Sequence, residues 1–195
     1  MKNSTITGVI LAGGKSSRMG VDKALLRLDG RPFIAHVATT LQAIFDRVIL
    51  MTNDASAYRF LGMESFEDIY RDRGPLGGIH SALLHADGAN IFVSACDTPF
   101  ISRELVTFLA AYPTTAPAAI AHMHEQIHPL CGIYTHQCLQ TAIDQLEAGQ
   151  YRVLEFVDKL GATIIPVTPD LSFYKDNLLS NFNTPEDYPP DANNS

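Results

Sequence analysis

Apolar stretches of strand length alternate with stretches of helix length in the first half of the chain, and this alternation most constrains the fold. Strands are expected where short apolar runs end in turn residues, at 5–12, 47–52, 65–68 and 91–95. Helices are expected at 32–44, after the capping pair Asn53-Asp54, at about 76–85, and after the capping residue Ser102. Crossovers that hold a helix predict βαβ units, hence an α/β fold with a mostly parallel sheet and helices on both faces.

The second half has a different pattern. Strands at 118–123 and 130–134 flank the polar tip His124-Glu125-Gln126 and are expected to form a hairpin. Helices are expected at 137–148 and 152–160, and late strands at 162–167 and 178–182. We expect a single domain over residues 1–188, with halves at about 1–112 and 113–188, and a frayed tail at 189–195.

Charge and cysteine content exclude several classes of protein. The formal net charge of −7 argues against a general nucleic-acid binder, whose domains are usually basic. Three widely spaced cysteines without a CxxC pair indicate a reducing compartment, with neither a disulfide framework nor a zinc knuckle. No signal peptide is apparent, and no stretch approaches the roughly 20 apolar residues of a membrane span. We expect a cytoplasmic monomer that binds neither nucleic acid nor membrane.

The run GVILAGGKSSRMGVDKALL, which starts at residue 8, joins the first strand to a loop rich in glycine and positive charge. Gly13 and Gly14 let backbone N–H groups approach an anion without a Cβ in the way. Arg18 can hold two phosphate oxygens with its planar fork, while Lys15 and Lys23 act as point charges. The spacing fits neither a P-loop nor the dinucleotide fingerprint. It predicts a different cradle for a nucleoside triphosphate, the alternative being a solvated basic turn.

Asp97 follows the buried strand expected at 91–95. Ligands of open α/β sheets bind beyond the carboxyl ends of the strands, so this carboxylate is well placed to hold Mg²⁺. Mg²⁺ is usually held by one or two carboxylates together with phosphate oxygens and water. The alternative is an aspartate that only stabilises its own turn.

Four motifs together resemble a known family. In chain order they are LAGGKSSRMGVDKALL, GPLGGIHSAL, ACDTPFIS and NFNTPED, and the resemblance covers about residues 5–187. They resemble the molybdenum cofactor guanylyltransferases, a branch of the nucleotidyltransferases. The resemblance implies a three-layer, Rossmann-like nucleotidyltransferase fold. It also implies transfer of GMP from GTP to the phosphate of molybdopterin, with release of pyrophosphate. The half at 1–112 would then bind the nucleotide and the half at 113–188 the acceptor.

The resemblance implies roles for individual residues. The implied catalytic residues are Lys15, Arg18, Lys23 and Asp97, with Asp97 as the Mg²⁺ ligand. The implied nucleotide-binding residues are Leu11, Ala12, Gly13, Gly14, Lys23, Asn53, Asp68 and Asp97. The implied acceptor-binding residues are His128, Arg152, Asn181 and Asn183.

Some of these assignments leave an alternative open. A register shift of two would put Met51 where the family has the asparagine assigned to Asn53. Asp68, without the resemblance, reads as a loop acid. Asn183 is equally well placed to cap a last helical turn. The spacing of His122, His124 and His128 suggests zinc, although no cysteine or acid completes a tetrahedral set and histidines on a hairpin are often polar surface.

Other functions also remain open. The same chemistry could use another base or acceptor, as in a molybdopterin cytidylyltransferase or a sugar-phosphate nucleotidyltransferase. A regulator could keep the fold and bind GTP without catalysis. The chain could also act mainly as a docking partner of a molybdenum insertase and of chaperones that serve the target enzymes.

Overall fold

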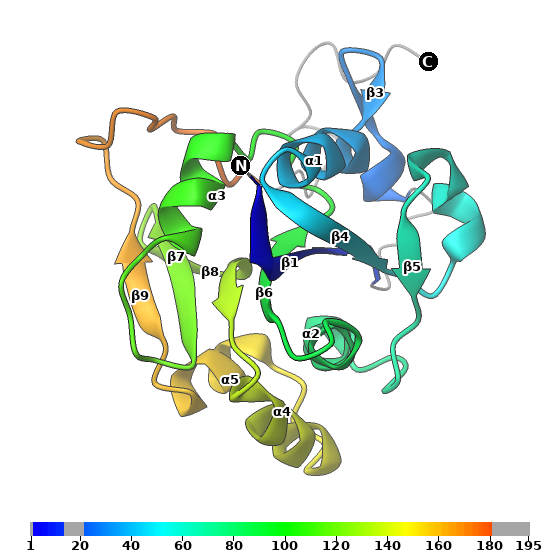
Figure 1. Cartoon of the computed structure of the whole chain (residues 1–195), viewed down its shortest axis with the longest axis vertical. Coiled ribbons are helices and arrows are strands. Elements are labelled where there is room, and N and C mark those ends of the chain that lie inside the picture. The colour runs from blue at the N-terminus through cyan, green and yellow to red at the C-terminus, as the bar shows by residue number, and fades with distance from the viewer. Residues whose placement is uncertain (1, 14–21, 181–195) are drawn as a thin grey trace.

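The computed structural model describes residues 2–13 and 22–180, and its centre is one seven-stranded sheet (Figure 1). In spatial order the strands are β5 (Glu64–Phe66), β4 (Phe45–Met51), β1 (Asn3–Leu11), β6 (Asn90–Ala95), β8 (Gln126–Tyr134), β7 (Ala118–Met123) and β9 (Thr163–Pro166). The four strands expected in the first half are all present. In the second half the hairpin is present as expected, but its second strand begins at Gln126 rather than Leu130.

The strands run in a pattern that gathers their carboxyl ends. β5, β4, β1 and β6 are parallel to one another, β8 is antiparallel to both β6 and β7, and β9 is parallel to β7. Six strands therefore end at one edge of the sheet, where β8 begins. We call it the carboxyl edge and define it by the last residues of these strands, Leu11, Met51, Phe66, Ala95, Met123 and Pro166.

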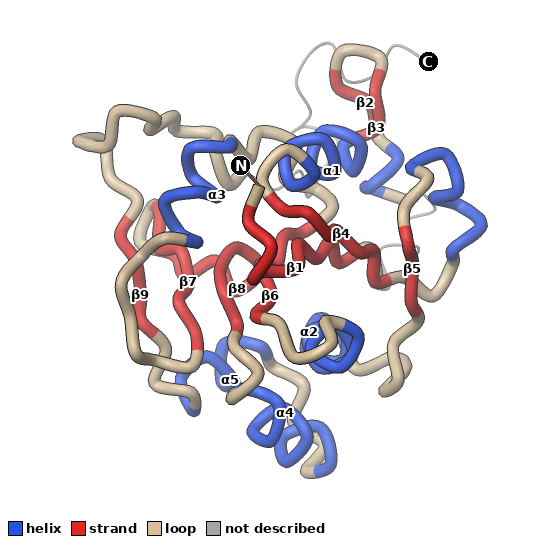
Figure 2. The backbone as a smooth tube through the Cα atoms, in the orientation of Figure 1, coloured by secondary structure: helices blue, strands red, loops and turns tan. Residues whose placement is uncertain are grey.

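Helices cover both faces of the sheet, so the molecule has three layers (Figures 1 and 2). α1 (Phe33–Gln42) and α3 (Arg103–Ala110) pack on one face. α2 (Gly74–His85), α4 (Cys138–Glu147) and α5 (Val153–Lys159) pack on the other. The expected mostly parallel α/β architecture is therefore confirmed.

Alternation along the strands fills two cores. In β1, Ile6 and Ile10 face α1 and α3, whereas Val9 and Leu11 face α2. Successive side chains of a strand point to opposite faces, so a strand buried on both sides is apolar at nearly every position. This explains why β1 reads as a continuous apolar run.

Short elements extend the layers. The 3₁₀ turn η2 (Lys23–Leu25) precedes a small hairpin of β2 (Arg27–Leu28) and β3 (Arg31–Pro32), and a second 3₁₀ turn, η3 (Ala55–Leu61), follows β4. The caps expected at the starts of η3 and α3 are confirmed, because Asp54 accepts hydrogen bonds from the N–H groups of residues 56 and 57, and Ser102 from that of residue 105.

The prediction of a strand at 178–182 is wrong for residues 178–180, the part of this range that the structure describes. Residues 178–180 lie in turns, in which Leu178 N–H donates to Lys175 O over 3.1 Å and Ser180 N–H to Asn177 O over 3.1 Å. Leu178 and Leu179 are nonetheless buried against the core of α1 and α3. The apolar pattern at these positions therefore reflects burial of Leu178 and Leu179, not pairing in the sheet. Residues 181 and 182 lie outside the described part of the chain.

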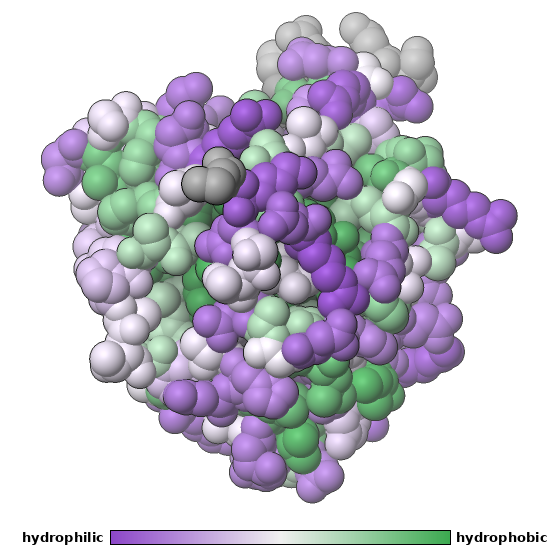
Figure 3. Space-filling model, viewed as in Figure 1, coloured by the Kyte–Doolittle hydropathy of each residue, from purple (hydrophilic) through white to green (hydrophobic). Residues whose placement is uncertain are grey.

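Figure 3 shows hydrophilic residues over most of the face that is in view, with hydrophobic residues in smaller patches between them. Such a mixture is ordinary for a folded protein surface. Within residues 2–13 and 22–180, no helix has the length and apolar character needed to cross a membrane.

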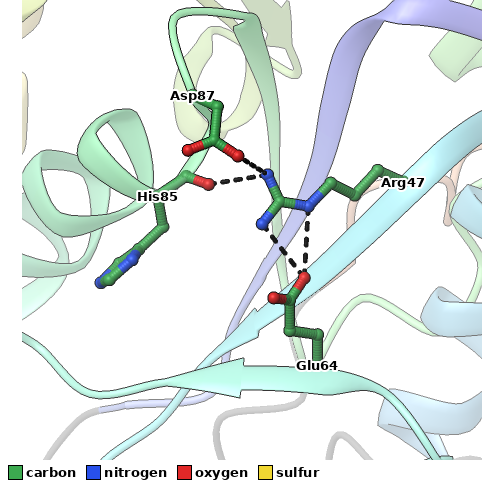
Figure 4. A network of polar contacts seen from close by, with 4 residues as sticks. All are labelled: Arg47, Glu64, His85 and Asp87. Carbon is green, nitrogen blue, oxygen red and sulfur yellow. Dashed lines mark hydrogen bonds and ion pairs between the residues drawn. The ribbon is translucent and has the colours of Figure 1, made fainter.

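A network around Arg47 joins β4, β5 and α2 (Figure 4). The Arg47 guanidinium donates to Glu64 Oε2 at 3.1 and 3.2 Å, to the carbonyl of His85 at 2.8 Å and to Asp87 Oδ2 at 3.1 Å. His85 is the last residue of α2, where carbonyl groups lack helical partners and a cation is favourable. The network therefore fixes the end of α2 to β4 and to the edge strand β5.

We expect Arg47→Ala to lower the free energy of unfolding by about 1–2 kcal/mol, because it removes several charge-assisted bonds on a side chain that is only partly exposed. Urea denaturation measures this change. Arg71→Ala is the matched control, since Arg71 forms an exposed ion pair with Glu67 within one loop and should have a clearly smaller effect. Equal effects of the two substitutions would contradict the assignment.

Candidate functional site

The candidate site lies at the carboxyl edge, where the turns after four parallel strands meet. Leu11 pairs in register with Met51 of β4 on one side and with Ala95 of β6 on the other. The turns that begin at Ala12 and Cys96 therefore start side by side. Crevices beyond the carboxyl ends of parallel strands are the usual ligand sites of open α/β sheets.

The turn after β1 is fixed by its neighbours. Ala12 N–H donates to Met51 O over 2.9 Å, and Cys96 N–H donates to Leu11 O over 3.3 Å. Gly13 comes next, is exposed, and lies against Asp68, because a Cβ at Gly13 would be 3.7 Å from Asp68 Oδ2. The turn after β1 thus places the backbone of Gly13, which has no side chain, directly beside the Asp68 carboxylate.

Asn53 and Asp68 form a pair across the ends of β4 and β5. Asp68 N–H donates to Asn53 Oδ1 over 3.2 Å, and Asn53 Nδ2 lies 3.5 Å from Asp68 Oδ2. Burial raises the pKa of the Asp68 carboxyl, and the hydrogen bond from Asn53 opposes that rise. Met51, the alternative position for the asparagine, is buried in the core under α2. Asn53 is therefore the residue of the two that stands beside Asp68.

Ser81 is a residue that the sequence reasoning missed. It is fully buried on α2, where its Oγ donates to Gly77 O over 2.9 Å and accepts from Ile69 N–H over 2.8 Å. The backbone at Asp68 and Ile69 is thus held from two sides, by Asn53 and by Ser81. A hydroxyl inside the otherwise apolar GPLGGIHSAL helix was the available signal.

The charges of Asp97 and Lys23 interact on the other side of the β1 turn. Asp97 follows β6 and is half-buried, and Lys23 is the first residue of η2. Burial raises the pKa of the Asp97 carboxyl, while the positive charge of Lys23 lowers it. Among the described residues, Lys23 is the cation whose charge acts on this desolvated carboxylate, and a further positive ion would also stabilise its ionised form.

The donor set around Asp97 is small. Among the residues that the structure describes, no three or more His, Cys, Asp or Glu side chains gather in a way that could hold a metal ion. Asp97 could therefore supply one carboxylate ligand, and an ion there would take other ligands from water or from a bound substrate. This is the arrangement that Mg²⁺ favours when it accompanies phosphates.

The residues assigned to the acceptor come from separate elements. His128 lies near the start of β8, at the carboxyl edge, and burial lowers its pKa. Arg152 is exposed at the N-cap of α5 and lies 3.5 Å from Glu155. The preceding Tyr151 carries the guanidinium of Arg73 over its ring at 4.7 Å, so this loop reaches the start of α2. The structure gives His128 and Arg152 different partners and no direct contact.

His122 and His124, whose spacing with His128 suggested zinc, lie on the same hairpin as His128. His122 is on β7 beside Ile127, and His124 occupies the turn, where its Nε2 is 3.0 Å from the carbonyl of Asp176. His128 Nε2 is 3.4 Å from Met123 O.

Five of the assigned residues lie outside the described part of the chain, so the structure does not place them: Gly14, Lys15, Arg18, Asn181 and Asn183. The site as described consists of the backbone at Leu11 to Gly13, the Asn53–Asp68 pair, and Lys23 beside Asp97.

Comparisons with known proteins show the family to which the chain belongs. The family model for the MobA-like NTP transferase domain matches residues 8–163. A protein from Flavobacterium johnsoniae, named a probable molybdenum cofactor guanylyltransferase, is 33% identical over 177 residues, which cover 90% of this chain and 93% of that protein. One of the same name from Carboxydothermus hydrogenoformans is 34% identical over 190 residues, covering 96% and 94%.

A solved structure shares the fold. The crystal structure of molybdopterin-guanine dinucleotide biosynthesis protein A from Archaeoglobus fulgidus superposes with a TM-score of 0.78 at 25% identity, covering 93% of this chain and 94% of that one. The family model spans most of the chain, and the curated relatives match over nearly their whole length. The chain therefore belongs to the MobA-like NTP transferase family, among relatives named molybdenum cofactor guanylyltransferases.

Proposed function

We propose that this protein is a molybdenum cofactor guanylyltransferase. It would transfer GMP from GTP to the phosphate of molybdopterin, form molybdopterin guanine dinucleotide and release pyrophosphate. The observation that carries the proposal is the carboxyl edge itself. There, Gly13 exposes its backbone beside the amide–carboxylate pair of Asn53 and Asp68, and the charge of Lys23 acts on the Asp97 carboxylate.

These two pairs suit the two ends of a nucleotide. Guanine presents donors and an acceptor along one edge, and a carboxylate, an amide and backbone groups can satisfy both kinds. Asp68 and Asn53, with the backbone of Leu11 and Ala12, would therefore select the base. Lys23 would neutralise charge near the α-phosphate and the leaving group. Gly13 would lie between, together with the cationic residues Lys15 and Arg18 of the undescribed loop.

The reaction needs little proton chemistry from the protein. The nucleophile would be the phosphate of molybdopterin, and a phosphate monoester has a second pKa near 6, so it is mostly dianionic at neutral pH. The chain's own residues would then act by orientation and by neutralising charge. His128 and Arg152, with Asn181 and Asn183, would hold the acceptor.

Asp97 would hold Mg²⁺ in this reaction. The ion, when bound, would neutralise phosphate charge and draw its other ligands from the triphosphate and water. The half-buried Asp97 carboxylate supports this assignment, because burial disfavours its ionised form and a bound cation would stabilise that form.

We expect Asp97→Asn to lower kcat for pyrophosphate release by at least about 100-fold, because the metal-binding charge is lost. The raised pKa of Asp97 means that its ionisation costs folding free energy at pH 7, a penalty that fades as the pH falls through that pKa. The thermal midpoint of the variant at pH 7, without ligand, should therefore be unchanged or higher. Asp46→Asn, an exposed carboxylate at the start of β4, is the control. Full activity of Asp97→Asn would reject the assignment.

Base selection is tested by thermal shift with GTP, ATP, CTP and UTP, each with and without Mg²⁺. Ligand at about 100 times its Kd stabilises by about 2.7 kcal/mol, or roughly 5–10 °C for a domain of this size. Of the four nucleotides, we expect only GTP to raise the thermal midpoint in this way, and we expect Mg²⁺ to increase the rise. A shift with CTP, or with another nucleotide, would replace the proposal by a sister activity. A GTP shift without turnover would favour a GTP-binding regulator.

We further expect Asp68→Asn to reduce the preference for GTP over ATP by about 10-fold or more, since a carboxylate accepts from both guanine donors and such charge-assisted bonds contribute about 1.5–3 kcal/mol. The ratio of the two Kd values, from titration calorimetry, measures the change. The control is Glu67→Gln, one residue earlier and exposed. An unchanged ratio would mean that Asp68 does not contact the base.

A further inference from the structure

A hydrogen bond joins the loops on the two sides of the candidate site. Tyr58 lies in η3, which follows β4, and its hydroxyl donates to Asp22 Oδ2 over 2.6 Å. Asp22 lies immediately before η2, 36 residues earlier in the chain. The Tyr58 ring is 5% exposed and packs in the same core as Ala24 of η2, which is fully buried. The contact is therefore part of the packed interior rather than a chance surface pairing.

Both carboxylate oxygens of Asp22 have a structural partner. Oδ2 accepts from Tyr58, and Oδ1 accepts from Ala24 N–H over 3.0 Å, which caps η2. The carbonyl of Asp22 accepts from Leu25 N–H over 3.0 Å. Burial, followed by the nearby Asp22, raises the pKa of Tyr58, so its hydroxyl remains a donor at neutral pH. Asp22 is thus committed to shaping η2.

The turn that Asp22 shapes presents Lys23. η2 has three residues, and so short a turn has no stability of its own. Its geometry must come from the Asp22 cap and from contacts with the core. Ala24, the residue after Lys23, is buried in the core cluster against which Cys96, the residue before Asp97, also packs. A shift of η2 would therefore change the approach of Lys23 to Asp97.

The other end of the contact lies in a capped turn. Asp54 caps η3 by accepting from Ser56 N–H over 3.1 Å and Ala57 N–H over 3.3 Å. Asp54 directly follows Asn53, which is bonded to Asp68. Tyr58 is therefore anchored to the segment that carries the base side of the site, while Asp22 carries the phosphate side.

We propose that Tyr58 is a positioning residue for catalysis, whose hydroxyl acts through Asp22 to hold Lys23 at Asp97. The inference rests on the proposed function, because it takes Lys23 and Asp97 as the phosphate side of a nucleotide site. A group that orients a charge needed in the transition state contributes to kcat more than to substrate binding. Tyr58 thereby links base recognition to the reacting phosphate.

The first test compares wild type with Tyr58→Phe, which keeps the ring and removes only the hydroxyl. We expect kcat for pyrophosphate release to fall by about 10-fold or more, with KM for GTP within about two-fold, because small misplacements of a catalytic group are costly. Tyr174→Phe is the matched control, since it also removes a tyrosine–aspartate bond, of 2.8 Å to Asp176, away from Lys23. Equal kcat values for Tyr58→Phe and wild type would overturn the proposal.

A double-mutant cycle with Lys23→Met separates positioning from general stability. If Tyr58 acts through Lys23, adding Tyr58→Phe to Lys23→Met should lower the residual kcat by less than two-fold. The same fold loss on both backgrounds would show that Tyr58 serves only as core packing, and the proposal would fall.

Hydrogen exchange tests the contact without any assumption about substrate. In Tyr58→Phe the amides of Ala24 and Leu25 should exchange faster, whereas those of Ser56 and Ala57, capped by Asp54, should not change. Unchanged exchange at both sites would overturn the inference whatever the activity. If the wild-type protein turns over a nucleotide other than GTP, the proposed function is overturned but the inference about Tyr58 is not. Wild type and Tyr58→Phe are then compared with that nucleotide. A wild type with no turnover also overturns the proposed function, and exchange alone then decides the inference.

Discussion

β1 hydrogen-bonds to β4 on one side and to β6 on the other, parallel to both, with Leu11 opposite Met51 and Ala95. This register brings the three turns that follow these strands to the same level. The turns themselves are then held by two backbone bonds, from Ala12 to Met51 and from Cys96 to Leu11. A slip by one residue would also turn Val9 and Ile10 to the wrong cores, because side chains alternate along a strand. Packing of the two cores and alignment of the site therefore depend on the same pairing.

The site places two carboxylates, Asp68 and Asp97, at the edge of a sheet whose two cores are apolar. Burial raises the pKa of both Asp68 and Asp97, so keeping them ionised opposes folding. Each has a compensating interaction, a hydrogen bond from Asn53 to Asp68 and the positive charge of Lys23 acting on Asp97. The two helical layers, together with the Arg47 network near the opposite end of the sheet, stabilise a fold that can tolerate such groups. Functional sites commonly retain polar groups that a purely stable fold would avoid.

Local sequence predicted most of the elements, because the signals were local. Asp54 and Ser102 each cap the helix or turn that follows them, and the hairpin around His124 and Glu125 forms where the polar tip interrupts two apolar runs. The late strand failed because Leu178 and Leu179 are buried in a turn, and burial alone does not specify sheet pairing. β8 begins at Gln126, earlier than expected, because its first residues pair with β7. Apolar periodicity along the sequence does not show this strand pairing.

By itself the sequence determined the α/β class, the two-sided burial of the strands, the glycine and cation content of the first loop, and the acids that follow strands β5 and β6. These are properties of short segments, and they follow from the conformational and burial preferences of the residues in each segment. Only the tertiary structure decided that Asp68 lies against Gly13, that Ser81 holds the neighbouring backbone, and that Tyr58 bonds to Asp22 across 36 residues. Such contacts depend on strand order and on the packing of helices against the sheet, and no local preference of a residue specifies which distant partner it will meet.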